Sequence, residues 1–171
     1  MTISYLALAG NWEDIDVIIA NLLDEQWNSA NTNSKEPEIR DGGSSASTRR
    51  AGPTKKTHTD QVRIKTVNHL NDEENSDTSR THNRMKTTLE IKIQTDNKNK
   101  AESYMREINR ILAEAHPNAG TRIDKVNDHD SQILYFSPPI PNWTTGIPDV
   151  LNTGTVIFSG IIGVEWAYER S

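Results

Sequence analysis

Residues 85–95 read MKTTLEIKIQT, and residues 100–115 follow almost at once with KAESYMREINRILAEA. In the first segment, alternate side chains are apolar or threonine, which predicts a strand with one dry face and one wet face. In the second, apolar residues recur every three or four positions, which predicts an amphipathic helix. The helical stripe needs a surface to cover, and the dry face of the strand is the nearest one. We therefore expect a helix packed on a sheet.

The ends of this helix are marked by the residues that flank it. Residues 96–99 are polar and can cap a helix, and Glu102 lies three residues after Asn99, the spacing of a capping box. Proline cannot continue a helix and glycine permits a reversal. Because Pro117 and Gly120 follow the apolar stripe, we expect the helix to end before them.

Length and composition indicate one domain with a small core. The 171 residues are too few for two ordinary domains, and 33% hydrophobic against 25% charged residues leaves much of the length for loops. The formal charge of −5 argues against a surface that binds nucleic acid throughout. Cysteine is absent, which excludes disulfides, thiolate metal sites and a cysteine nucleophile.

No targeting or membrane segment is evident in the sequence. The first ten residues are apolar but lack the basic leader of a secretory signal. The apolar run at 156–164 is too short to span a bilayer. We therefore expect a soluble protein that is made and used without export and that contacts no membrane.

A first helix and a long connector precede the strand. Asn11 or Asp14 can cap a helix that extends to about Ser29, with an apolar stripe and an acidic opposite face. Residues 30–59 are rich in Asn, Ser, Thr, Gly, Pro and charged residues. This composition predicts an extended polar connector.

The segments after the second helix predict a further pair of strands. Apolar residues within 123–136 indicate a third strand, and prolines in 138–148 forbid regular pairing there, so we expect a fixed loop. The closing run 155–168 is apolar on both faces and predicts a strand that is central or covered on both sides. Gly160 and Gly163 are candidates for bulges in it.

Together these elements predict an α+β fold. Residues 61–70 form the strand that pairs with the 85–95 strand, and residues 71–83 form the tip of that antiparallel hairpin. The economical arrangement is one four-stranded, mainly antiparallel sheet with two helices packed on it, in the order α-β-β-α-β-β. We expect a single domain over residues 1–171, with 30–59 as its connector.

The sequence offers little catalytic chemistry. No glycine-rich phosphate loop and no nucleophile elbow occur in it. Residues 127–130 read Asn-Asp-His-Asp and can ligate a divalent metal, but no second ligand cluster is spaced to complete a site, which favours a solvated turn. We therefore expect a protein that is not an enzyme, with no catalytic residues, no metal and no cofactor.

Three segments are candidate contact sites. The connector carries a basic arm, which either faces nucleic-acid phosphate or solubilises the loop. Its residues are Arg49, Arg50, Lys55 and Lys56. Two apolar residues of the proline-rich segment, Trp143 and Ile147, either contact another subunit or pack locally. The hairpin tip carries acidic side chains that can reach a partner: Asp72, Glu73, Glu74 and Asp77.

The chain resembles the tail-terminator and tail-completion proteins of tailed viruses in the order of its elements and in five segments. These are Leu22-Leu23-Asp24-Glu25-Gln26-Trp27, Pro37-Glu38-Ile39, Leu89-Glu90-Ile91-Lys92-Ile93-Gln94-Thr95, Glu107-Ile108-Asn109-Arg110-Ile111-Leu112 and Gly163-Val164-Glu165-Trp166-Ala167-Tyr168. The resemblance covers most of the chain outside the connector. It implies a sheet flanked by helices and assembly as a ring, commonly six-fold, at the end of the tail tube nearest the capsid. It implies no catalytic residues.

On this resemblance we expect a structural virion protein of the tail or neck, a homohexamer that is assembled in the host cytoplasm. Its expected partners are its own copies, the tail tube protein, and a head-completion, adaptor or portal-proximal neck protein. Packaged DNA is expected to be a non-specific partner of the basic arm. Two alternatives stay open: a head-completion or adaptor protein beneath the portal, and a small DNA-binding regulator that uses the basic arm.

Overall fold

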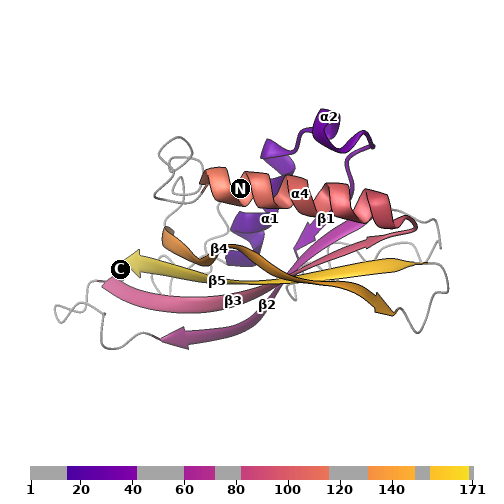
Figure 1. Ribbon diagram of the computed structural model, residues 1–171. Coiled ribbons are helices and arrows are strands. Elements are labelled where there is room, and N and C mark those ends of the chain that lie inside the picture. Colours follow the sequence, from indigo (N-terminus) through magenta and orange to yellow (C-terminus); the bar gives the residue numbers. More distant parts are fainter. Residues whose placement is uncertain (1–14, 42–59, 72–81, 116–130, 149–154, 170–171) are drawn as a thin grey trace.

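A five-stranded sheet and three helices make up the described part of a computed structural model, residues 15–41, 60–71, 82–115, 131–148 and 155–169 (Figure 1). The sheet has the strand order β1-β2-β3-β5-β4. The predicted α+β class is confirmed. Along the chain the elements are α1 (Ile15–Gln26), α2 (Ser29–Thr32), β1 (Glu38–Asp41), β2 (Gln61–Asn71), β3 (His82–Thr95), α4 (Lys98–Ala115), β4 (Ser131–Pro148) and β5 (Val156–Glu169).

β3 lies at the centre of the sheet. It pairs antiparallel with β2 on one side and with β5 on the other. Its register with β5 is unbroken over the full length of β3. Alternate side chains of β3, including Leu89, Ile91 and Ile93, are fully buried beneath the helices. The strand therefore has the dry face and the wet face that period-two alternation indicates.

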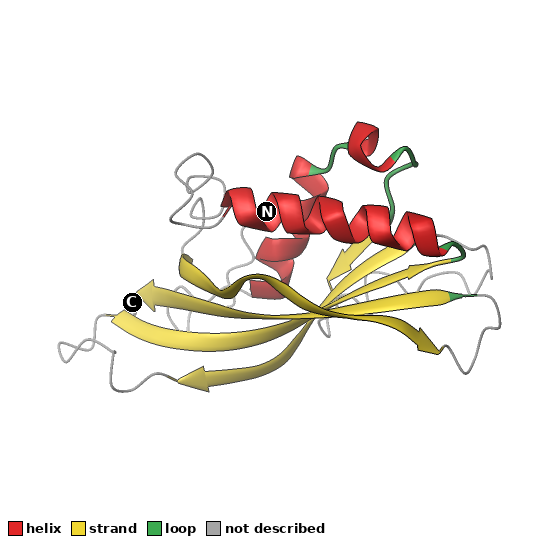
Figure 2. Cartoon of the chain, in the orientation of Figure 1, coloured by secondary structure: helices red, strands yellow, loops and turns green. Residues whose placement is uncertain are grey.

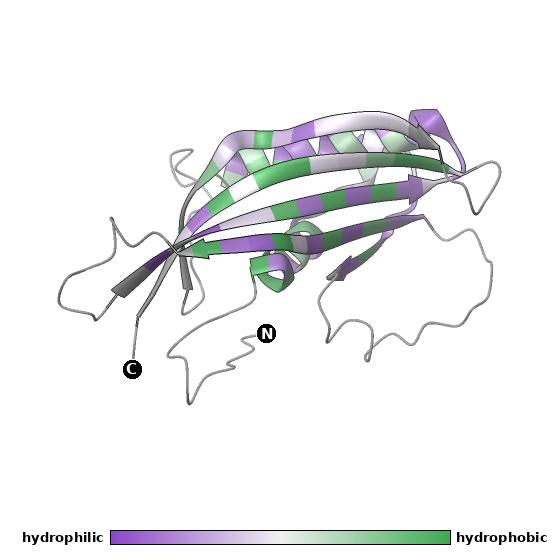
Figure 3. Cartoon of the chain, turned by 90° about the horizontal axis from the view of Figure 1, so that it is seen from below, coloured by the Kyte–Doolittle hydropathy of each residue, from purple (hydrophilic) through white to green (hydrophobic). Residues whose placement is uncertain are grey.

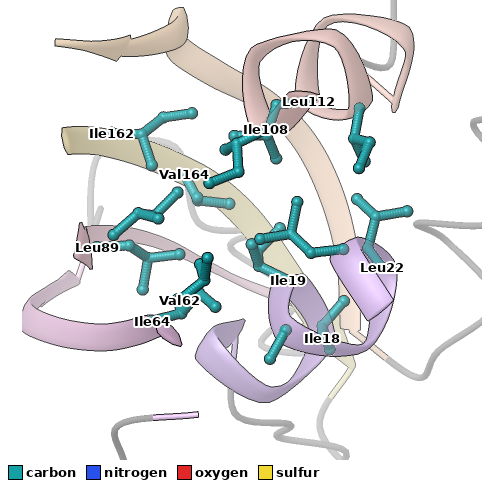
Figure 4. Packing of buried hydrophobic residues seen from close by; sticks show 14 of the residues in the cluster. Ile18, Ile19, Leu22, Val62, Ile64, Leu89, Ile108, Leu112, Ile162 and Val164 are labelled. Carbon is teal, nitrogen blue, oxygen red and sulfur yellow. The ribbon is translucent and has the colours of Figure 1, made fainter. Parts of the chain in front are cut away.

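The helices cover only one face of the sheet (Figure 2). α4 packs on β3, β4 and β5, while α1 packs on β1 and β2. α4 buries the predicted stripe, in which Tyr104, Ile108 and Leu112 are fully buried. In the core, Ile19 and Leu22 of α1 lie among the side chains of α4 and the sheet (Figure 4). Full burial of one such side chain contributes about 1.5–3 kcal/mol, so apolar contact holds the helices in place.

The sheet differs from the prediction of four mainly antiparallel strands and two helices. β1 adds a fifth strand at the edge beside β2 and runs parallel to it, which makes the sheet mixed. The third helix, α2, is a single turn capped by Asn28, whose side chain accepts a hydrogen bond from the N–H of Ala30 at 3.0 Å. Both elements lie in or next to the predicted connector. Each of the two elements has only four residues, and β1 has a single buried apolar residue, Ile39. Neither is therefore long enough to show the repeat of apolar residues that identifies a strand or a helix.

Both helix boundaries shift slightly from their predicted positions. α4 begins at Lys98, and Asn97 caps it: the Asn97 Oδ1 accepts hydrogen bonds from the N–H groups of Asn99 at 2.8 Å and Lys100 at 3.3 Å. Asn99 is therefore inside the helix, and the predicted capping box with Glu102 does not form. α1 ends at Gln26, about one turn before its predicted end.

β4 continues through the proline-rich segment that was predicted to be a fixed loop. Its pairing with β5 breaks between Ser137 and Asn142, and Pro138, Pro139 and Pro141 fall within that break. Because β4 is the edge strand, its outer side needs no N–H donors, which is why a strand tolerates prolines here. The prediction of irregular pairing is correct, but the segment still belongs to the sheet.

The two glycines of β5 do not form the predicted bulges, since the register with β3 has no shift at either of them. They let β4 lie close to β5 instead. A Cβ atom at Gly160 would lie 2.9 Å from the ring of Trp143, and one at Gly163 would lie 2.8 Å from the carbonyl oxygen of Ser137. β5 itself is central in the sheet, as predicted.

The predicted hairpin of β2 and β3 is confirmed, although most of its tip lies outside the described residues. Val67, which interrupts the alternation of β2, falls at a register shift between Thr66 and Asn68. Residues 42–59 of the predicted connector also lie outside the described residues. Among the helices that are described, none is both long and apolar enough to cross a membrane.

Candidate functional site

The face of the sheet opposite the helices is the candidate functional surface of this chain. Figure 3 looks onto this face, with the helices behind the strands. We call it the open face because no described element covers it. Strand alternation and pairing register place these charged side chains on it: Glu38, Arg40, Arg63, Lys65, Arg84, Lys86, Glu90, Lys92 and Glu165.

The open face is basic although the chain is acidic. Its described charged side chains are six Lys or Arg residues and three Glu residues, a net charge of +3. The described side chains away from this face include five Lys or Arg residues and nine Asp or Glu residues, a net charge of −4. Among the described side chains, the open face therefore has a positive net charge and the remainder a negative one.

Three cations line up across neighbouring strands of the open face. The register places Arg40 of β1 opposite Arg63 of β2, and Arg63 opposite Lys92 of β3. Neighbouring strands lie about 4.8 Å apart, so this basic row spans about 10 Å. Like charges placed directly opposite one another destabilise a sheet. The basic row is therefore a site of unfavourable electrostatics that an anionic partner would relieve.

Carboxylates within the same face compensate the row only in part. Arg40 pairs with Glu38 at 2.8 Å, and Lys92 lies 3.7 Å from Glu90. Arg63 is exposed and forms no ion pair with any described residue. Partly exposed ion pairs contribute about 0–1 kcal/mol each. The positive potential is thus centred on Arg63.

The opposite end of the open face is closer to neutral. Glu165 lies 3.5 Å from Arg84 and 3.6 Å from Lys86, and its side chain is only 14% exposed. Two apolar side chains also lie on this face: Leu70, 58% exposed, and Ile161, 40% exposed. Charged residues around exposed apolar ones are the usual composition of a protein contact surface.

A second polar cluster joins the helices to one another. Glu107 of α4 is 2% exposed, and its carboxylate accepts hydrogen bonds from the Asn28 N–H at 2.9 Å, the Asn31 amide at 2.8 Å and the Arg110 Nε at 3.0 Å. Burial opposes the charge, but the hydrogen bonds from Arg110, Asn31 and Asn28 lower the pKa of Glu107 below its usual value. These contacts attach α2 to α4, so the cluster is structural.

A third cluster joins β2, β3 and α4. The Asp60 carboxylate accepts hydrogen bonds from the Thr95 hydroxyl at 2.7 Å and the Lys100 ammonium at 3.1 Å. The Tyr104 hydroxyl lies 3.1 Å from Asp60 and 2.9 Å from the carbonyl oxygen of Lys35. Burial, together with the nearby Asp60 charge, raises the pKa of Tyr104 far above its usual value. A phenol held neutral in this way stabilises the junction of the strands with the helix.

The predicted contact residues are only partly within the described structure. Trp143 of β4 is half-buried, and its Nε1 donates a hydrogen bond to the Asn109 Oδ1 of α4 at 2.8 Å. It thus packs locally, and its contact with another subunit stays a prediction. Ile147 lies in β4 opposite Ile157. The following lie outside the described residues: Arg49, Arg50, Lys55, Lys56, Asp72, Glu73, Glu74, Asp77 and the 127–130 run.

Sequence reasoning did not identify the open face as a site. It did predict a wet face for the 85–95 strand, which carries Lys86, Glu90 and Lys92. The basic row also needs Arg40 and Arg63, and only the pairing register brings these beside Lys92.

Among the described residues, no group of three or more His, Asp or Glu side chains is placed to hold a metal ion. No protein-family model matches the sequence, and no curated protein matches it significantly.

Proposed function

We propose that this protein is a structural virion subunit that forms a homo-oligomeric ring, of six copies, at the head-proximal end of a viral tail. In this role it terminates the tail tube and joins the tail to the head. The observation that carries the proposal is the separation of charge between the open face, at +3, and the other described side chains, at −4. A ring of identical subunits needs two different surfaces that complement one another.

The fold supports a scaffolding role because its longest elements are rigid and well packed. Strands of 14 and 18 residues exceed the usual strand length of about 5–6 residues. The described polar clusters at Glu107 and Asp60 hold helices and strands together. Such a sheet offers a broad surface, which suits a subunit that sets the geometry of a ring.

The partners follow from where the ring would lie. Its lower side would meet the tail tube protein, and its upper side would meet a head-completion, adaptor or portal-proximal neck protein. The basic arm 49–56 would face packaged DNA and contact its phosphates without sequence preference. The acidic hairpin tip, from Asp72 to Asp77, and the Trp143 segment would contact neighbouring subunits.

Mass measurement of the purified full-length chain tests the ring. Native mass spectrometry should show a closed oligomer, and six copies of the 19.2 kDa chain would have a mass of about 115 kDa. A monomer at all concentrations would contradict the proposal. Particles made without this protein should then have tails of uncontrolled length, or heads that do not join tails, in electron micrographs. Normal particles would also contradict it.

The same experiments separate this role from that of an adaptor beneath the portal, because a reconstruction of the virion would show at which level the ring lies. A DNA-binding regulator is the second candidate, and the four cations of the basic arm 49–56 favour it. That candidate predicts binding of duplex DNA by the isolated chain, with an affinity that falls steeply as salt is raised. Loss of the salt dependence on neutralising Arg49, Arg50, Lys55 and Lys56 would assign the binding to the basic arm.

A further inference from the structure

We infer that the basic row on the open face docks against an acidic patch on the helix side of a second copy of this chain. The acidic patch consists of Asp24, Glu25 and Glu36. Copies joined in this way are related head to tail, with each one using two different surfaces. The inference rests on the proposed ring and names the surfaces that build it.

The acidic patch lies on the layer opposite the open face. Asp24 and Glu25 are exposed near the C-terminal end of α1, and Glu36 is exposed in the segment between α2 and β1. None of the three forms an ion pair with a described residue. Partial burial and the neighbouring Asp24 carboxylate raise the pKa of Glu36. The patch thus contains two carboxylates that repel one another.

The described residues therefore include two surfaces of opposite sign: a basic row in which three cations are neighbours, and an acidic patch in which Asp24 and Glu36 interact. α1, which carries Asp24 and Glu25, lies on one side of the sheet (Figure 1), and strand alternation with the pairing register places the basic row on the other side. The sheet stands between them, so they do not meet within one molecule. Contact between two copies would relieve the repulsion in both surfaces at once, and such complementarity directs both orientation and rate of association.

The size of the open face suits a protein partner. Ten residues along β2 and five strands across give a projected area on the order of 600 Å² from standard strand spacings. Standard protein interfaces bury about 800 Å² per partner. The exposed apolar side chains Leu70 and Ile161 lie on the same face and supply apolar contact. The face is thus close in size to one side of a standard interface, and it combines charged with apolar side chains.

The pattern of charge on this face fits a protein better than a phosphate backbone. Glu38 and Glu90 lie within 2.8 Å and 3.7 Å of two of the three cations, and their carboxylates would repel phosphates. The open face has six cations, but three carboxylates lie among them, so it does not present a continuous run of positive charge to a phosphate backbone. A partner surface of both signs, such as another copy of this chain, has no such conflict.

Charge reversal tests the inference with an unusual combination of readouts. Arg63→Glu places a carboxylate between Arg40 and Lys92, and Glu36→Arg places a cation beside Asp24. Each variant should fold at least as stably as the wild type, because it removes a repulsion within the chain. Each should nevertheless weaken assembly tenfold or more, as measured by sedimentation of the full-length chain at low salt. A loss of assembly with retained stability would not reflect misfolding.

The double variant R63E/E36R is the decisive sample. If residue 63 of one copy faces residue 36 of the next, the double variant again pairs opposite charges at that contact, so it should assemble at least about threefold better than either single variant. Lys98→Glu, an exposed position outside both surfaces, makes the same change in net charge as R63E and should leave assembly unaltered. Equal weakening by K98E would show that only net charge matters and would overturn the inference.

Two further outcomes separate the inference from the proposed function. If the wild type forms rings and R63E forms them equally well, the docking surfaces are wrong while the ring stands. If the wild type is monomeric at every concentration, the ring itself is wrong. A variant R63E that assembles normally but no longer binds duplex DNA would assign the basic row to nucleic acid and overturn the inference.

Discussion

Replacement of Glu107 by leucine should destabilise the protein substantially. The Glu107 carboxylate is almost completely buried and accepts hydrogen bonds from the Asn28 N–H, the Asn31 amide and the Arg110 guanidinium. Leucine has a similar volume but no acceptor, so all of these donors lose their partner. A buried polar group left without a partner costs about 1–3 kcal/mol.

The expected magnitude follows from the surroundings of each donor. Asn28 and Asn31 are exposed residues that water can reach, so each loss should lie near the lower limit, about 1 kcal/mol. Arg110 keeps hydrogen bonds to Glu114 and to the Gln26 carbonyl oxygen, both at 3.0 Å, so its charge is not stranded. We therefore expect a total loss of about 2–3 kcal/mol, below the 3–5 kcal/mol typical of a fully buried broken ion pair.

Urea denaturation of the full-length chain at pH 7 measures this loss. With an m-value of about 2 kcal/mol/M, the midpoint should fall by about 1–1.5 M without a change in m. Glu114→Leu is the matched control, because Glu114 pairs with the same arginine but its side chain is 41% exposed. That variant should lose less than about 1 kcal/mol. Equal losses in the two variants would refute the claim that burial of Glu107 makes its contacts important.

Three further predictions concern the same interior. The pKa of Glu107 is lowered in the folded state, so its contribution to folding stability is complete above the unfolded pKa of 4.5 and declines as the pH falls below it. The unfolding free energies of the wild type and Glu107→Gln, measured in urea, should therefore approach one another in acid. A difference that stays constant with pH would show that the pKa of Glu107 is not lowered. Asn97→Ala should lower the thermal midpoint through a loss of about 1 kcal/mol, whereas Asn99→Ala should have little effect; the reverse order would show that Asn99 is the cap. Thr87→Val removes the hydroxyl that accepts a hydrogen bond from the buried Trp166 Nε1 at 2.8 Å and should cost about 1–3 kcal/mol in chemical denaturation, while an unchanged midpoint would mean that this bond is dispensable.

The β3 and α4 elements were predictable because each repeats its pattern often enough to be recognised. Five alternate residues of β3, from Met85 to Ile93, are apolar or threonine, and the apolar stripe of α4 extends from Ala101 to Ala115. β1 and α2 are four residues each, and their positions depend on contacts with β2 and with Glu107. Contacts between segments that are distant in the sequence cannot be recognised from a local pattern, so these two elements were not predicted.

The candidate site was beyond sequence reasoning for a related reason. Arg40, Arg63 and Lys92 belong to three strands that are far apart along the chain, and one of these strands was not predicted. A shift of one residue in either pairing would place a buried neighbour such as Ile39 or Val62 where a cation now lies. The polar character of the face could be predicted, whereas the alignment of its cations required the register.

The prolines of β4 also limit how sheets of this protein can merge. Pro138, Pro139 and Pro141 supply no amide hydrogen, so this margin is a poor template for an incoming strand. At the opposite edge of the sheet, the four residues of β1 pair with only the first four residues of β2. Residues Lys65 to Asn71 of β2 extend past the end of β1. If two molecules paired through their β1–β2 edges, the combined sheet would end at both sides in a proline-containing β4 strand. Edge-to-edge pairing would therefore stop at a dimer and would not continue into fibrils.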